Sequence, residues 1–413
     1  MQPKLRIAVD CRITNAQQGI GTAVLALAKA LSDSEVTDQE YTFIVQESMT
    51  GWLFPYIHGP CKLASIPDPK LPAFSALKSV LRHIPPLRLL RKKLRRTSIS
   101  IPTSDGFVES QRFDLVHFPT QMAYLTSLPS IFQPWDLQHV HHPEFFAKED
   151  RVLRNHQYAA FSQQASCVCV QAEWTKRDVM EHLGIPAEKI AVIPWGPVFD
   201  AYQRPSADDI RLTVKKYMLP KDFFFYPAVT WPHKNHEIIF RALHILKRDY
   251  KISPTVVFTG ASTDYRTILD KLARDLGISQ CLQFLGFLPP VDLQAIFKAA
   301  TAMIFPSRFE GFGLPILEAF HAGLPVFSST ATTLPEVARE GALYFDPDSP
   351  NQLADLMHSI LCQPEMRQDL IRKGTLVLSK YSSKEMAADF RALYARTVES
   401  VTCHSGQCQV STS

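Results

Sequence analysis

Glu310 and Glu318 stand eight positions apart around a glycine-containing turn and are the two carboxylates of this chain best placed for chemistry. The apolar residues 302–305 before them predict a buried strand, and Gly311 and Gly313 let the backbone come close to a ligand. A predicted helix starts after the turn, and the first N–H groups of a helix are unpaired donors that attract phosphate. The segment therefore suits a ligand with both hydroxyls and phosphates, such as a sugar nucleotide. The plainer alternative is an ordinary strand, turn and helix with two surface glutamates.

A second candidate is Lys234, in the sequence Trp231-Pro-His-Lys-Asn-His236 after the apolar residues 223–226. A lysine held at the start of a helix can neutralise the negative charge that grows on a leaving diphosphate. The alternative is a helix N-terminus with a solvated lysine.

Polar groups are dense between positions 136 and 144, where Asp136, His139, His141, His142 and Glu144 fall within nine residues. Such a cluster suggests metal binding. No clean ligand pair at helical i, i+4 spacing with a second cluster elsewhere accompanies it. We therefore favour a pocket for a sugar or an acceptor.

Gly19 and Gly21 follow the first predicted strand and open a predicted helix. A Gly-x-Gly pair is a weak signal by itself, because it also occurs in plain turns. Its position after a first strand favours a ligand-binding loop, and Asp10 and Arg12 just before it point the same way.

Predicted strands and helices alternate along the chain, which indicates parallel sheets covered by helices. The first series has a helix at 22–31 and strands at 5–9, 41–45, 115–118 and 167–170; the second has strands at 223–226, 255–259, 283–285, 302–305 and 325–328. We predict two doubly wound α/β domains facing a cleft, with ligands beyond the carboxyl ends of the strands.

The expected parts are an acceptor-side domain, a nucleotide-sugar domain, a helix that crosses back onto the first domain, and a disordered tail. Their predicted bounds are residues 1–198, 199–385, 386–401 and 402–413.

The segment 306–326 resembles the Glu-x7-Glu signature of retaining glycosyltransferases of family 4, which have the GT-B fold. The likeness continues through Pro335-Glu336-Val337 and Gly341-Ala342, is strong over residues 231–347 and is looser before them. The block 136–146 looks most like bacterial mannosyl- or rhamnosyl-type members that build surface polysaccharide. This implies GDP-mannose as the weakly favoured donor.

The resemblance also implies roles for individual residues. Glu310 would lie near the donor sugar, Glu318 would accept hydrogen bonds from the ribose, and Lys234 would face the diphosphate. The catalytic residues expected on this basis are Glu310, Lys234, Asp136 and His139, and the donor-binding residues are Gly19, Gly21, His233, Lys234, Phe312, Gly313, Leu314 and Glu318. No metal site and no cofactor is expected, because Lys234, backbone N–H groups and helix dipoles can carry the diphosphate charge.

Two positions depart from the family pattern. Trp135 stands where many members have a histidine before the aspartate, and residues 227–230 lack an arginine that many members carry. Asp136 or His139 would then contact the sugar or the acceptor, and His233 would assist Lys234.

Length and composition set further limits. The 413 residues suit two domains rather than one core. The chain has no run of 18 uncharged apolar residues, and charges on both sides of the first apolar run favour a strand over a secretory signal. Eight cysteines without a tight spacing pattern favour a reducing compartment, so we expect a cytoplasmic protein.

The net charge of +4 hides a basic segment, residues 69–104, with no acidic residue. Its nine basic residues are Lys70, Lys78, Arg82, Arg88, Arg91, Lys92, Lys93, Arg95 and Arg96. Residues 82–96 mix these with leucines and fit an anionic membrane surface or a phosphorylated lipid acceptor, while a solvated helix face is the alternative. Nucleic acid is a poor fit, because aromatic residues for base stacking are missing there.

The sequence thus predicts a retaining hexosyltransferase that uses a nucleoside diphosphate sugar and a glycan or lipid-linked acceptor. The alternative is a nucleotide-sugar-binding protein of the same fold that has lost transfer.

Overall fold

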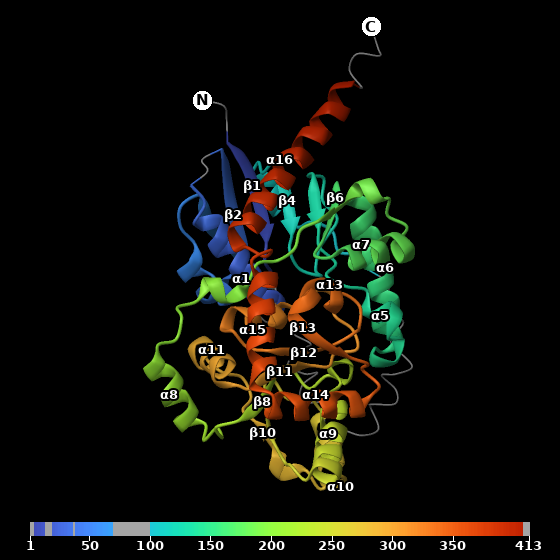
Figure 1. Ribbon diagram of the computed structural model, residues 1–413. Helices are drawn as coiled ribbons and strands as arrows, with labels where there is room; N and C mark the ends of the chain where they lie inside the picture. Colours follow the sequence, from blue (N-terminus) through green and yellow to red (C-terminus); the bar gives the residue numbers. More distant parts are fainter. Residues whose placement is uncertain (1–3, 13–18, 36–37, 69–99, 408–413) are drawn as a thin grey trace, which may run out of the picture.

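The computed structural model of the chain describes residues 4–12, 19–35, 38–68 and 100–407, with side chains as far as residue 402. Two all-parallel sheets form its frame, one above the other in Figure 1. The first has the strand order β3-β2-β1-β4-β5-β6-β7 and the second β10-β9-β8-β11-β12-β13. Both are doubly wound sheets, as the alternation of elements predicts.

The strands of the first sheet are β1 (Leu5–Asp10), β2 (Gln39–Gln46), β3 (Cys61–Ile66), β4 (Leu115–Phe118), β5 (Ser130–Phe132), β6 (Cys167–Val170) and β7 (Ile190–Val192). Those of the second are β8 (Phe223–Pro227), β9 (Thr255–Thr259), β10 (Leu282–Phe284), β11 (Ala302–Phe305), β12 (Val326–Ser329) and β13 (Ala342–Phe345). The central strands read as continuous apolar runs because helices cover both faces of the sheet, and the first four residues of β8 are fully buried.

The helices of the first half are α1 (Gly19–Ser32), α4 (Phe107–Ser110), α5 (Gln138–His141), α6 (Lys148–Gln164) and α7 (Glu173–Leu183). Those that follow are α8 (Ala207–Lys216), α9 (His236–Ile245), α10 (Arg266–Asp275), α11 (Pro290–Ala299), α12 (Leu314–Ala322), α13 (Leu334–Ala338), α14 (Pro350–Cys362), α15 (Pro364–Leu378) and α16 (Ser383–Gln407). Helix α1 begins at Gly19, three residues before the predicted start, so the Gly-x-Gly pair lies in its first turn.

The chain crosses between the two sheets twice at one place. Gly196, on the way to the second sheet, lies against Ser383, where α16 starts the way back; a Cβ on Gly196 would stand 2.5 Å from the Ser383 nitrogen. Helix α16 then runs beside the first sheet (Figure 1), and the Tyr394 hydroxyl lies 3.0 Å from Nδ1 of buried His117 on β4.

The predicted disordered tail is wrong in its first part. Helix α16 continues through Thr402 to Gln407, because the turn that starts at Thr402 extends a helix that is already formed, and its hydroxyl bonds the Val398 carbonyl. Residues 408–413 lie outside the described residues.

Candidate functional site

The carboxyl ends of β8 and β11 lie side by side where the strand order of the second sheet reverses. In doubly wound sheets, ligands bind at this point. Strand β8 leads to Lys234 and β11 leads to Glu310. The topology therefore brings together two residues that are 76 positions apart in the sequence.

Lys234 and Glu310 form an ion pair at this place. The Lys234 Nζ donates to the Glu310 Oε1 at 2.5 Å, and the two side chains are only 20% and 14% exposed. A charge so far withdrawn from water is costly unless it is paired, and here each of the two residues is the partner of the other. A diphosphate that approached Lys234 would compete with Glu310 and release its carboxylate.

Two threonines after β12 fix the backbone of Glu310. The Thr332 hydroxyl accepts from the Glu310 amide at 3.1 Å and donates to its carbonyl at 2.9 Å. The Thr333 hydroxyl lies 3.1 Å from the carbonyls of both Glu310 and Phe312. The sequence does not predict these two threonines as site residues, because nothing in their spacing shows which loop they reach.

The backbone of Lys234 is fixed in a similar way from the sheet. The Tyr226 hydroxyl donates to its carbonyl at 2.8 Å. Asn235 has a left-handed backbone, with φ at 55°, and its amide donates to the carbonyls of Pro306 and Pro347 at 3.1 and 2.9 Å. Asn235 thereby ties the loop after β8 to the loop after β11.

Gly311 brings the loop that holds Glu310, residues 306–313 (the acidic loop), against the first half of the chain. A Cβ on Gly311 would stand 2.3 Å from the carbonyl oxygen of Trp135, so only glycine fits this approach. The Thr175 hydroxyl of α7 donates to the Gly311 carbonyl at 3.2 Å. The position is thus a close contact between segments of the two halves.

Asp136 lies at the same contact. Its carboxylate accepts from the Gln138 amide at 3.0 Å and from the Gln121 side chain at 3.4 Å. Burial raises the pKa of Asp136, and the charge of Glu310 acts in the same direction. The structure therefore gathers three of the four predicted catalytic residues, Glu310, Lys234 and Asp136, within electrostatic reach of one another.

His139, the fourth, lies elsewhere. Its side chain is buried, with 3% exposure, and packs edge-to-face against Tyr158 at 5.1 Å between ring centres. Burial lowers the pKa of His139 to about 4, so the ring stays neutral at pH 7. The suggested contact of His139 with sugar or acceptor does not fit this position, because α5 turns its ring into the core of the first half.

Helix α12 begins immediately after the acidic loop. Gly313 precedes it with φ at +105°, and within the described residues no acceptor is found for the amides of Gly313 and Leu314. These amides are available to an anion at the helix N-terminus. Phe312 is 3% exposed and packs against Tyr381, so a ligand would meet its backbone rather than its ring.

Glu318 lies one turn further along α12. Burial raises its pKa to about 8, and no described residue forms a hydrogen bond or ion pair with its carboxylate. The nearby charge of Glu318 contributes to the raised pKa of Tyr202, which places the two side chains close together. A half-buried carboxyl without a donor is suited to accept hydrogen bonds from ligand hydroxyls.

His233 lies beside Lys234 without adding positive charge. Burial, together with the charge of Lys234, lowers the pKa of His233 to about 2. The neutral ring can donate a hydrogen bond to a phosphate, but the cation of the site is Lys234.

Gly19 and Gly21 open α1, next to the switch point of the first sheet between β1 and β4. At the end of β1, Asp10 accepts from the Arg12 guanidinium at 2.6 Å and from the Tyr124 hydroxyl at 2.8 Å. Within the described residues, no hydrogen bond joins either glycine to Lys234 or Glu310.

A further link between the halves runs through Glu336 on α13. Its two carboxylate oxygens accept from the amides of Glu173 and Trp174, the first residues of α7, at 2.7 and 2.9 Å. An anion at a helix N-terminus satisfies amides that have no partner in the helix. This contact sets the position of α7 beside the acidic loop.

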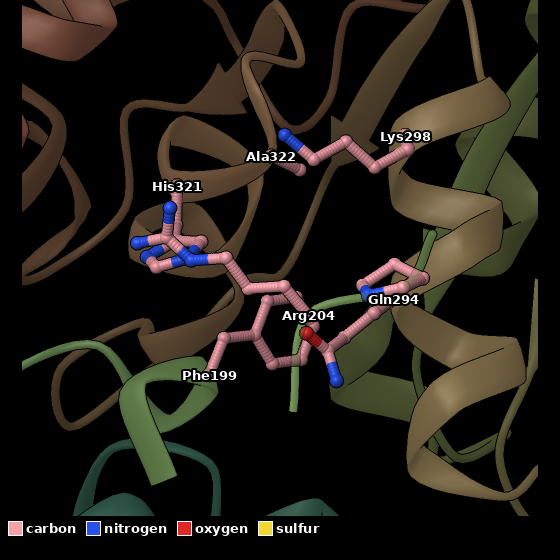
Figure 2. A pocket seen from close by; sticks show the side chains of 7 residues that line it. Phe199, Arg204, Gln294, Lys298, His321 and Ala322 are labelled. Atoms are coloured by element: carbon pink, nitrogen blue, oxygen red, sulfur yellow. The ribbon is translucent and has the colours of Figure 1, made fainter. Parts of the chain in front are cut away.

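A small pocket lies apart from the ion pair, between α11, α12 and the segment that leads to α8 (Figure 2). Phe199, Arg204, Lys298 and His321 line it, and its volume of about 30 Å³ holds little more than water. It is too small for a sugar nucleotide.

The basic residues 82–96, with the predicted membrane contact, lie outside the described residues. In the part of the chain that is described, no helix is long and apolar enough to cross a membrane.

Two family models match successive parts of the chain. Residues 18–196 match the model described as Glycosyltransferase Family 4, and residues 213–377 match Glycosyl transferases group 1. The O-antigen chain mannosyltransferase B of Escherichia coli is 24% identical over 218 residues, which are 53% of this chain and 57% of that protein. The serotype-specific mannosyltransferase WbdA of Escherichia coli is 27% identical over 63% of this chain, which spans 33% of WbdA.

Solved structures confirm the predicted GT-B fold with its two Rossmann-like sheets. Anabaena Alr3699/HepE in complex with UDP and glucose aligns with a TM-score of 0.71 at 16% identity, over 95% of this chain and 100% of that one. Sucrose-phosphate synthase from Thermosynechococcus elongatus aligns with a TM-score of 0.71 at 17% identity, over 96% and 100% of the two chains.

Proposed function

We propose that this chain, which is built from the two domains of the family 4 and group 1 glycosyltransferases, transfers a hexose from a nucleoside diphosphate sugar to a glycan or lipid-linked acceptor. The Lys234–Glu310 ion pair at the switch point carries the proposal, because it combines a cation for a diphosphate with a carboxylate for sugar hydroxyls. The start of α12 and Glu318 extend the site for phosphate and ribose.

Donor binding in this proposal begins with an exchange of partners at Lys234. The diphosphate takes the ammonium group from Glu310, and the freed carboxylate accepts hydrogen bonds from the sugar. Negative charge grows on the diphosphate as the bond from the anomeric carbon to the phosphate oxygen breaks. Lys234 and the amides of Gly313 and Leu314 stabilise this charge without a metal ion.

In the proposal, the configuration at the anomeric carbon is retained because the acceptor attacks the same face of the sugar that the diphosphate leaves. The acceptor oxygen bonds to the anomeric carbon, and its proton passes to the departing phosphate oxygen. Asp136 comes from the first half of the chain, beside the loop of Glu310 in the second half, and is suited to contact the sugar or the acceptor.

Mannose from GDP-mannose is the favoured sugar, because the chain is similar to O-antigen mannosyltransferases. The structural neighbour HepE binds UDP and glucose, so the base must be tested separately. The acceptor would be a growing surface polysaccharide or its lipid carrier, at an anionic membrane surface contacted by residues 82–96.

Separate incubations with GDP-, UDP-, dTDP- and ADP-sugars, without acceptor, test the proposal through released nucleoside diphosphate and thermal shift. Release with one donor, lost in Glu310→Gln, is expected. Release that Glu310→Gln leaves unchanged would refute the assignment of the site. No stabilisation by any donor would refute the donor site itself.

The alternative is a protein that binds the nucleotide sugar and does not transfer it. Trp135 and the missing arginine at residues 227–230 favour this alternative, while the paired Lys234 and Glu310 favour the enzyme. Stabilisation by a donor, without release in the presence of membrane-derived acceptors, would decide for the alternative.

A further inference from the structure

Three side chains that bind metals in other proteins meet beside the acidic loop. His141 ends α5, while Asp178 and His182 lie one turn apart on α7. The His141 Nε2 and the His182 Nδ1 lie 2.6 and 3.0 Å from the same oxygen of Asp178. One ligand atom from each residue falls within 4.8 Å of the other two.

Asp178 provides a second and independent sign of a ligand. Its side chain is 3% exposed, and its other oxygen, Oδ2, is buried without a hydrogen-bond partner in the described residues. A buried carboxylate oxygen that lacks a partner costs free energy, and most such oxygens are satisfied by a donor or a metal. Both histidine side chains keep a solvent-accessible edge, at 30% and 27% exposure, so an ion can reach the cluster.

We propose that His141, Asp178 and His182 bind one divalent transition-metal ion, with Zn²⁺ as the best fit. Two imidazole nitrogens and one carboxylate are a common ligand set for zinc, with water in the fourth position. Bond lengths of about 2 Å in a tetrahedral site hold ligand atoms roughly 3.3 Å apart. The present separations of 2.6 and 3.0 Å are those of hydrogen bonds, so a small opening of the cluster admits the ion.

The geometry at His182 fixes its tautomer while no ion is bound. Both neighbours of its Nδ1 are acceptors, namely the Asp178 carboxylate at 3.0 Å and the Asp178 carbonyl oxygen at 3.1 Å, so Nδ1 is the donor. Coordination of an ion by Nδ1 needs the other tautomer, with the hydrogen on Nε2.

The site would act on the proposed donor residues through position. The His141 ring packs on Phe309 with 5.2 Å between centres, and Phe309 immediately precedes Glu310. Trp174 of α7 packs on Phe309 from another side at 5.6 Å. A metal ion that joins α5 to α7 would fix the His141 and Trp174 rings on either side of Phe309 and thereby hold the acidic loop in place.

The sequence predicts no metal site here, because residues 136–144 contain no clean helical ligand pair of their own. The pair is Asp178 and His182, at i and i+4 on α7, and only the parallel order of β5 and β6 brings α7 beside α5. The proposal concerns the binding of a metal ion, so its test does not depend on the proposed transferase activity.

Calorimetric titration of the full chain with Zn²⁺, after chelation and removal of any purification tag, tests the proposal. One ion per chain is expected, together with the visible absorption of tetrahedral Co²⁺ when Co²⁺ is the probe. Asp178→Asn and His141→Gln should each weaken Zn²⁺ binding by at least about tenfold, because each removes one of three protein ligands. His156→Gln is the matched control, since its ring lies exposed on α6 away from the cluster.

The result that overturns the proposal is the absence of stoichiometric binding, or equal affinity in all variants, which would mean adventitious binding elsewhere. Zn²⁺ should also raise the melting temperature of the wild type and of His156→Gln but not of His141→Gln. His141 lies at a partly exposed helix end, so this variant is expected to fold even if Asp178→Asn does not.

Discussion

In the free protein, the Glu310 carboxylate accepts a hydrogen bond from the Lys234 ammonium group at 2.5 Å. The product nucleoside diphosphate would compete with Glu310 for this ammonium group, so we expect the two residues to have opposite effects on its binding. Lys234→Ala should weaken binding, because the diphosphate loses its cation. Glu310→Gln should strengthen binding or leave it unchanged, because Lys234 is then free for phosphate. Both variants should lower turnover, Lys234→Ala by about 10²- to 10³-fold.

Titration of each variant with the nucleoside diphosphate, alongside turnover of the identified donor, measures both effects. Lys234→Arg is the control that keeps the charge. If Glu310→Gln weakened binding as much as Lys234→Ala, the partner exchange proposed for this pair would be wrong.

Glu318 should make the stability of the ligand-free protein depend on pH. Its folded-state pKa of about 8 lies above the ordinary glutamate value of 4.5, so the folded chain holds a proton that the unfolded chain releases in between. Stability should therefore fall as pH rises from about 4.5 to 8, by at most about 1.4 kcal/mol per pH unit from this group. Glu318→Gln removes this slope.

Melting temperatures of wild type and Glu318→Gln at pH 5 and pH 9 measure the difference. The variant should gain stability relative to the wild type at pH 9 and little at pH 5, while losing affinity for nucleotide. An equal difference at both pH values would show that Glu318 does not titrate in this range.

Among the elements, α16 depends on a buried hydrogen bond that can be tested directly. Burial lowers the pKa of His117 to about 3, so its ring is neutral. Its Nε2 lies 3.2 Å from the Gln133 Oε1 and must donate, which leaves Nδ1 to accept from the Tyr394 hydroxyl. Tyr394→Phe leaves this nitrogen without a donor and should cost about 1–3 kcal/mol of unfolding free energy.

Chemical denaturation of Tyr394→Phe and Tyr56→Phe provides the comparison. The Tyr56 hydroxyl has no hydrogen-bond partner among the described residues, and its ring is half-buried, so its loss should have little effect. Equal stability of the two variants would mean that the bond to His117 contributes nothing.

The elements also show what the sequence can and cannot predict. Buried parallel strands appear as short apolar runs, so β8 and β11 and the residues that follow them, Lys234 and Glu310, are predictable. The first residue of a helix is harder to predict. Gly19 and Gly21 are typical of a loop in the sequence, but in the structure they form the first turn of α1. The sequence predicts His139 at the site, because nothing near Asp136 shows that the next turn faces the core.

The sequence also does not predict which distant segments contact each other. Thr332 belongs to ordinary loop sequence, and the family resemblance around Glu336 does not show what Glu336 contacts. Only the fold brings the two residues to Glu310 and to the start of α7. Hydrogen bonds of this kind depend on the relative position of the two sheets, which no local pattern encodes.

In the whole molecule, the two halves meet at the acidic loop through Gly311. Its missing side chain lets the Trp135 carbonyl approach, and an alanine Cβ would stand 2.3 Å from that oxygen and 3.2 Å from the Asp136 Cβ. Backbone atoms cannot yield as a flexible side chain can, so Gly311→Ala should push Asp136 away from Glu310 and Lys234. Donor binding by the second half should remain, while transfer should fall by about 10²-fold, as a misplacement of about 1 Å can cause.

Nucleotide affinity and transfer rate of Gly311→Ala, measured beside Gly51→Ala, separate these effects. Gly51 is the matched control, because a Cβ there meets nothing within 4 Å. Loss of nucleotide affinity equal to the loss of transfer would mean that Gly311 acts within the donor loop alone. Retained affinity with lost transfer would show that the chemistry requires both halves at this separation, with Asp136 supplied from the first half to a donor held by the second.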